Sequence, residues 1–138
     1  MPAPEWPDEL GGLRLELRDH LKRLAIWSGI SVLVGIKLIG LFANAEVVRS
    51  AGVMTAGWAV VNLIIVGASW NGKPPASRAQ FREFIWLNQG LNAGYVGVGL
   101  ALALAGSSAA VVGSGWAVVP QGLALLVMDG ILLRRVPR

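Results

Sequence analysis

Apolar residues come in four long blocks along the chain, and the short segments between these blocks hold most of the charged residues. The hydrocarbon core of a bilayer is about 30 Å thick, so a helix rising about 1.5 Å per residue needs roughly 20 apolar residues to cross it. Four stretches satisfy this requirement: residues 24–43, 51–70, 83–102 and 115–133. The pattern predicts an all-α fold in which residues 24–138 form one domain, a four-helix transmembrane bundle.

A different pattern precedes the first block. Leucines at positions 10, 13, 17, 21 and 24 recur at helical spacing, and most of the residues between them are charged. This spacing fits a short N-terminal amphipathic helix on the membrane surface, with basic groups facing anionic lipid headgroups. It fits equally an extension of the first span beyond the membrane. We therefore expect residues 1–23 to form a cytoplasmic tail with an interfacial helix, made irregular at its start by three prolines.

The basic residues predict an orientation. Ten of them flank the spans on the side that holds both termini: Arg14, Arg18, Lys22, Arg23, Lys73, Arg78, Arg82, Arg134, Arg135 and Arg138. The opposite side carries only Arg49. Because cytoplasmic loops carry the excess of Lys and Arg, we expect both termini to be cytoplasmic.

Composition narrows the function classes. Charged residues make up 14% of the chain, against about 25% in a typical soluble domain. Because the basic residues cluster between apolar blocks, the net charge of +4 indicates membrane topology and gives no reason to expect a nucleic-acid partner. Arginine outnumbers lysine nine to three and Gly, Ala and Val are abundant, which we interpret as a bacterial, inner-membrane protein. There is no cysteine, and the single histidine, His20, disfavours a histidine-rich metal site.

Polar residues inside the predicted spans are the candidates for function, because a charge at mid-bilayer costs about 2.5–3.5 kcal/mol and polar groups there turn toward partners or a cavity. These candidates are Lys37, Asn62, Asn88, Asn92, Tyr95, Gln121 and Asp129. Counting about 1.5 Å per residue from the cytoplasmic boundary groups Asn88 with Asp129, and places Lys37 level with Tyr95 and Gln121. That depth excludes a direct Lys37–Asp129 ion pair, so Lys37 is expected to reach toward Glu46 or to donate to Gln121 and Tyr95.

Helical spacing gathers small and polar residues into stripes. Asn88, Asn92 and Tyr95 share one face of the third span, and Gly122 and Asp129 lie seven residues apart on the fourth. We expect such stripes to face one another. Four glycines are candidates for close helix packing, within or between chains: Gly90 and Gly94, which form G-x-x-x-G, Gly97 one turn further, and Gly122.

The stretches LNQGLNAGY, residues 87–95, and QGLALLVMD, residues 121–129, resemble those of an uncharacterised bacterial family of small four-span membrane proteins. That family shows N-x-G-L-[DN]-x-G-Y in its third span and Q-G…D in its fourth. Where the family often has Asp, this chain has Asn92, which puts in doubt any role there that needs a carboxylate. The resemblance implies no activity.

Two functions remain open at this stage. One is a non-catalytic structural or accessory bundle whose amides and glycines mediate helix packing or the binding of a partner, in a homo-oligomer or a larger membrane complex. The other is a small oligomeric transporter or channel with a polar midplane cavity lined by Asn62, Asn92 and Gln121. Neither paired carboxylates nor a nucleophile motif indicates an enzyme, and no cofactor is expected.

Overall fold

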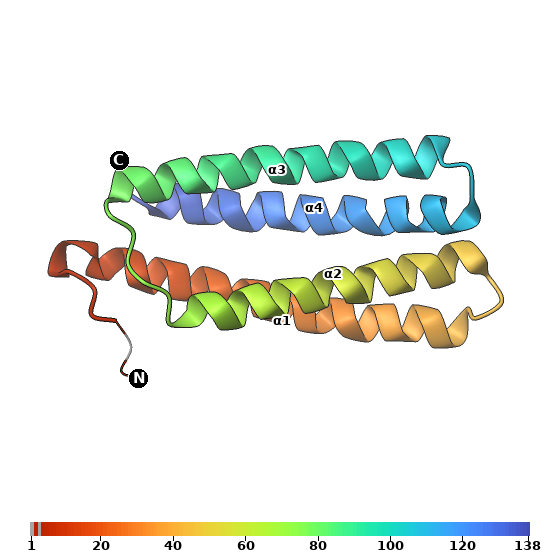
Figure 1. Ribbon diagram of the computed structural model, residues 1–138, viewed down its shortest axis with the longest axis horizontal. Helices are drawn as coiled ribbons and strands as arrows, with labels where there is room; N and C mark the ends of the chain where they lie inside the picture. Colours follow the sequence, from red (N-terminus) through yellow and green to blue (C-terminus); the bar gives the residue numbers. More distant parts are fainter. Residues whose placement is uncertain (1, 3) are drawn as a thin grey trace.

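The computed structural model describes residues 2 and 4–138, and this part of the chain is all-helical. A short 3₁₀ turn, Asp8–Leu10, leads into α1 (Gly11–Leu41), which is followed by α2 (Glu46–Trp70), α3 (Arg78–Ala105) and α4 (Ala109–Arg135). The helices run up and down, so both termini lie at the same end of the bundle (Figure 1). We call this the termini end. The predicted all-α, four-helix fold is confirmed.

The bundle consists of two helical hairpins. α1 packs along α2, and α3 packs along α4, while the main contact between the hairpins joins α2 to α4. For most of its length α3 lies away from α1 and α2 (Figure 1). The bundle is therefore less tightly closed on the side between α2 and α3.

Glycines set the close approach within each hairpin. A Cβ atom at Gly35 of α1 would lie 2.6 Å from the carbonyl oxygen of Gly52 in α2. In the second hairpin, a Cβ at Gly122 would lie 2.8 Å from Cγ2 of Val96. Any larger residue at these positions pushes the helices apart. Gly122, one of the predicted packing glycines, thus lies where α4 approaches α3 closely.

The other three predicted packing glycines do not pack within the chain. A Cβ atom at Gly90, Gly94 or Gly97 would meet no atom within 4 Å, because this face of α3 points out of the bundle. Gly99 approaches α4 instead, where its Cβ would lie 3.1 Å from the carbonyl oxygen of Gly115. The sequence motif therefore marks an outer face of α3, and a single glycine beyond it makes the contact.

The N-terminal leucines lie inside the bundle. Of the two arrangements left open by their spacing, the structure has the continuous one, since α1 runs unbroken from Gly11 to Leu41. Leu10 and Leu13 pack on α3 and α4, and Leu21 and Leu24 pack on α2 and α4. The buried cluster at the termini end contains Leu10, Leu13, Phe81, Ile85, Leu132, Leu133 and Val136.

Side-chain hydrogen bonds fix the helix ends. Ser77 Oγ accepts from the Gln80 backbone N at 3.1 Å at the start of α3, and Ser108 Oγ accepts from the Val111 N at 3.2 Å at the start of α4. Such N-caps satisfy backbone donors that the helix leaves unpaired. Near the C-terminus of α4, the Arg82 guanidinium donates to the carbonyl of Leu133 at 3.2 Å.

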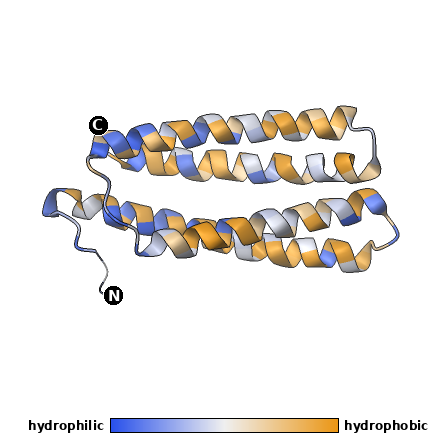
Figure 2. Cartoon of the chain, viewed as in Figure 1, coloured by the Kyte–Doolittle hydropathy of each residue, from blue (hydrophilic) through white to orange (hydrophobic). Residues whose placement is uncertain are grey.

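Three helical segments in the described part of the chain are long and apolar enough to cross a membrane: Asp8–Leu41, Glu46–Trp70 and Ala109–Arg135. α3 is of similar length but is not among these segments, and it carries the amides of Asn88, Gln89 and Asn92 in one short stretch. The third of the four predicted spans therefore stays a prediction. Hydrophilic residues gather at the termini end, and the middle of the bundle is mostly hydrophobic (Figure 2).

Candidate ligand-binding groove

A groove of about 990 Å³ lies between the two hairpins and is lined by residues from all four helices. α2 and α3 supply most of the lining, while α1 and α4 contribute residues near the termini end. Val53, Val61 and Phe84 line the groove and yet remain 57%, 55% and 57% exposed. The groove therefore opens sideways, along the flank of the bundle.

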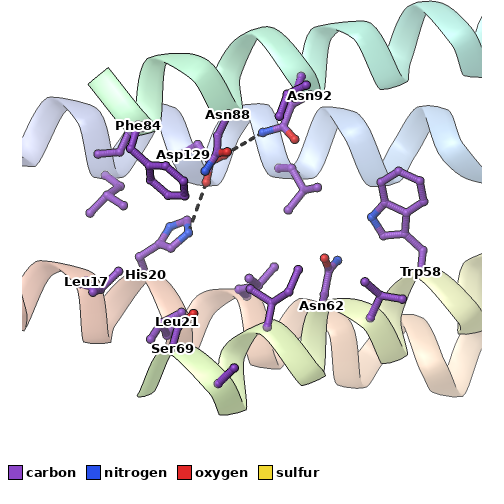
Figure 3. Close-up of a pocket in the computed structure, with 18 of the residues that line it drawn as sticks. Leu17, His20, Leu21, Trp58, Asn62, Ser69, Phe84, Asn88, Asn92 and Asp129 are labelled. Atoms are coloured by element: carbon purple, nitrogen blue, oxygen red, sulfur yellow. Dashed lines mark hydrogen bonds and ion pairs between the residues drawn. The ribbon is translucent and has the colours of Figure 1, made fainter. Parts of the chain in front are cut away.

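A buried polar cluster lies at the termini end of the groove (Figure 3). Asn92 Nδ2 of α3 donates to Asp129 Oδ2 of α4 at 2.7 Å. Nε2 of His20, on α1, lies 3.2 Å from the other carboxylate oxygen, Oδ1. Both carboxylate oxygens are thus engaged, and the cluster links the first helix to the second hairpin.

The helical pattern explains how these side chains meet. Asn88 and Asn92 are four residues apart on α3, so both face the groove, and Asn88 points toward Asp129 in Figure 3. Asp129 lies two turns after Gly122, on the face of α4 that α3 approaches closely. The depth count grouped Asn88 with Asp129, and both residues line the groove.

Sequence reasoning missed His20 as a member of this site. The residue belongs to the buried leucine face of α1, seven positions after Leu13 and four before Leu24. That spacing was the available signal, because a polar residue on an apolar helix face needs a partner. A search for that partner would have pointed to Asp129, the acid in the fourth apolar block.

Aromatic side chains narrow the groove toward its other end. The rings of Trp58 in α2 and Tyr95 in α3 meet edge to face, with centroids 4.9 Å apart and planes at 85°. At the termini end, Lys73 of the α2–α3 link lines the groove together with Phe81 and Phe84. The groove thus carries polar groups at one end and an aromatic contact at the other.

Two of the predicted site residues lie elsewhere. Gln121 faces α1, where its Oε1 accepts from Trp27 Nε1 at 2.8 Å and its Nε2 donates to Ser31 Oγ at 3.2 Å. Lys37 lies on an exposed face of α1 and takes part in none of the ion pairs found among residues 2 and 4–138.

The depth count explains this error. It began the first span at residue 24, whereas α1 starts at Gly11, and Trp27 and Ser31 lie beside Gln121. Lys37 is six residues beyond Ser31, or about 9 Å further from the termini end. It therefore does not share a layer with Gln121.

The remaining candidates, Asn62, Asn88, Asn92, Tyr95 and Asp129, all line the groove. Asn62, on α2, is buried and points into it (Figure 3). Within the described residues, no group of three His, Cys, Asp or Glu side chains is placed to hold a metal ion. The arrangement is suited to binding a molecule that is apolar over most of its length and polar at one end.

The fold and the groove define an all-helical protein with helices long and apolar enough to cross a membrane. The chain belongs to a family of unknown function, DUF6992, whose model matches residues 23–130. This agrees with the expected membership of an uncharacterised family. The matched region includes Asn62, Asn92 and Asp129 and begins after His20. No curated protein and no solved structure matches the chain.

Proposed function

We propose that this protein is a non-catalytic, multi-pass membrane protein that takes a lipid-like amphiphile from the bilayer into the groove between its two hairpins. The observation that carries the proposal is a sideways opening of about 990 Å³, apolar along most of its lining and polar at one end. Ligand sites typically measure about 300–1,000 Å³ and combine an apolar lining with a few converging polar groups. In a membrane, such an opening faces acyl chains.

The apolar helices and the distribution of basic residues suggest how the protein lies in the membrane. All four helices cross the bacterial inner membrane, with the amides of α3 turned toward the groove and toward α4 rather than toward lipid. The termini end is cytoplasmic, because ten of the basic residues lie there or in the link between α2 and α3. This places the polar cluster in the cytoplasmic half of the membrane.

The contacts of the Asp129 carboxylate support a binding role without catalysis. Asp129 is engaged through both oxygens, by Asn92 and His20, so it holds three helices together instead of offering a free base. A polar path through Asn62, Asn92 and Gln121 has less support, because Gln121 faces α1 and lies outside the groove lining. The open glycine face of α3 leaves room for a second copy or a larger membrane complex.

The test fills the groove at a glycine. Gly57 lines the groove, and a Cβ atom there meets no atom within 4 Å, so Gly57→Phe adds volume without a clash in the backbone. Gly67 lies on the same helix and is equally open, but it is outside the groove lining, so Gly67→Phe is the matched control.

Each variant is purified from membranes that contain fatty acyl chains with a photoreactive diazirine, and the adducts are mapped by peptide mass spectrometry. The parent protein and Gly67→Phe are expected to carry adducts on groove-lining peptides of α2 and α3. Gly57→Phe is expected to lose most of these adducts and to keep those on the outer faces. Equal labelling of the groove peptides in both variants would overturn the proposal.

A further inference from the structure

Two buried polar atoms in the groove have no hydrogen-bond partner among the described residues: Nδ2 of Asn62 and Nδ1 of His20. The two residues are 5% and 7% exposed, and both line the groove. Buried polar atoms are almost always paired, because an unpaired one loses its hydrogen bonds with water and gains none in return. A molecule bound in the groove would find these two atoms free to form hydrogen bonds.

The chemistry of each atom defines the group it needs. The Asn62 amide nitrogen is a donor, so its partner is an acceptor such as a carbonyl oxygen. Nε2 of His20 lies 3.2 Å from the Asp129 carboxylate, and on this contact we assign the proton of the neutral imidazole to Nε2. Nδ1 is then an acceptor, and its partner is a donor such as a hydroxyl group.

The two positions are separated along the groove. Figure 3 shows His20 at the level of Ser69 and Asn62 further along the helix bundle, toward Trp58. Ser69 and Asn62 are seven residues apart on α2, which is about 10 Å along the helix. A ligand that reaches both atoms therefore carries its acceptor and its donor at separate positions along its length.

A cation marks the polar mouth of the groove. Among the described residues that line the groove, Lys73 is the only lysine and there is no arginine. Lys73 takes part in none of the ion pairs found among the described residues, so no acidic side chain pairs with it. An anionic group at the mouth fits this charge, and the link between α2 and α3 is where a lipid phosphate would lie.

We propose that the ligand is a monoacyl glycerophospholipid. Its ester carbonyl accepts a hydrogen bond from Asn62 Nδ2, its free glycerol hydroxyl donates to His20 Nδ1, and its phosphate pairs with Lys73. The acyl chain runs toward Trp58 and Tyr95 and leaves through the open side. This assignment rests on the proposed function. It excludes diacyl lipids, because their second ester replaces the hydroxyl group that His20 requires.

The experiment uses native mass spectrometry to measure the dissociation constant of 1-palmitoyl-lysophosphatidate for the full chain in a neutral detergent. Matched probes each lack one feature: the hexadecyl ether lacks the carbonyl, the 2-deoxy analogue lacks the hydroxyl, and dipalmitoyl phosphatidate replaces that hydroxyl by an ester. Glycerol 3-phosphate carries the headgroup without the chain. Each missing hydrogen bond is expected to weaken binding about fivefold, and glycerol 3-phosphate is expected not to bind.

Protein variants assign each probe effect to its residue. In Asn62→Leu the ester and ether lipids are expected to bind equally, while the 2-deoxy lipid stays weaker than the parent lipid. In His20→Ala the parent and 2-deoxy lipids are expected to bind equally. His20→Ala also removes a partner of Asp129 and can therefore disturb the fold. Lys73 is exposed, so Lys73→Gln tests the site without that risk. In Lys73→Gln, lysophosphatidate and uncharged monopalmitoylglycerol are expected to bind with equal affinity.

The outcomes separate the two proposals. Equal affinities of the parent chain for the ester, ether and 2-deoxy lipids overturn the ligand assignment, as does tight binding of glycerol 3-phosphate or a preference for the diacyl lipid. Such a result, combined with loss of groove adducts in Gly57→Phe, leaves the groove as a lipid site with another ligand. Unchanged adducts in Gly57→Phe overturn both.

Discussion

Asn92 donates a hydrogen bond of 2.7 Å to Asp129, and this contact joins α3 to α4 at the level where α1 also reaches the carboxylate through His20. The pair lies at the polar end of the groove. In an apolar environment a carboxylate needs donors for its oxygens, because an unpaired buried acceptor is costly. The contact thus stabilises the fold and shapes the candidate site at the same time.

Replacing Asn92 by Leu is expected to destabilise the protein. Asp129 would keep only His20 as a partner, and the loss of a hydrogen bond to a charged group costs about 1–3 kcal/mol. The measurement is the free energy of unfolding in a detergent titration followed by circular dichroism. Asn88→Leu is the control, because Asn88 lies one turn away on the same helix and is only half buried. Equal destabilisation by the two substitutions would contradict the assigned role of Asn92.

The pattern of apolar blocks predicted the helices well, because length and hydropathy depend on one segment at a time. The stripe on the third span depends on the same kind of information: Asn88, Asn92 and Tyr95 share one face by their spacing, and all three line the groove. These features need no knowledge of how the hairpins meet.

The errors concern relations between helices. Lys37 was placed level with Gln121 because the count began at residue 24, and only the hydrogen bond from Trp27 to Gln121 reveals the actual register. Likewise, G-x-x-x-G at Gly90 and Gly94 indicates close packing but does not say against what. Register and pairing come from side-chain contacts across helices, which helical spacing does not contain.

The two kinds of glycine on the second hairpin are expected to respond differently to substitution. Gly122→Leu should cost about 2 kcal/mol or more, because its Cβ would already lie 2.8 Å from Val96 and 3.2 Å from the carbonyl oxygen of Asn92. Gly94→Leu should leave the stability of the monomer unchanged, since that face is open. Thermal unfolding of both variants in detergent checks the difference. A larger loss in Gly94→Leu would show that the open face is packed in the native assembly.

Arg82 is expected to hold the end of α4. Its guanidinium donates to the backbone carbonyls of Leu133 and Val136, groups that the helix end leaves without intrahelical partners. In Arg82→Ala, the amides of the last turn of α4 should exchange hydrogen for deuterium faster, while the middle of the helix remains unchanged. Arg134→Ala is the control, because Arg134 is also basic but exposed. Protection that survives in Arg82→Ala would show that these two bonds do not hold the terminus.

The orientation is expected to place Arg138 and Lys73 in the cytoplasm and Arg49 on the opposite side, because the basic residues gather at the termini end. The chain has no cysteine, so each single-cysteine variant, R138C, K73C or R49C, reports one position. A membrane-impermeant maleimide applied to intact spheroplasts should label only R49C, and all three should react after the membrane is opened. Because residues 73 and 138 flank α3 and α4, labelling of K73C and R138C from opposite sides would mean that α3 does not cross the membrane.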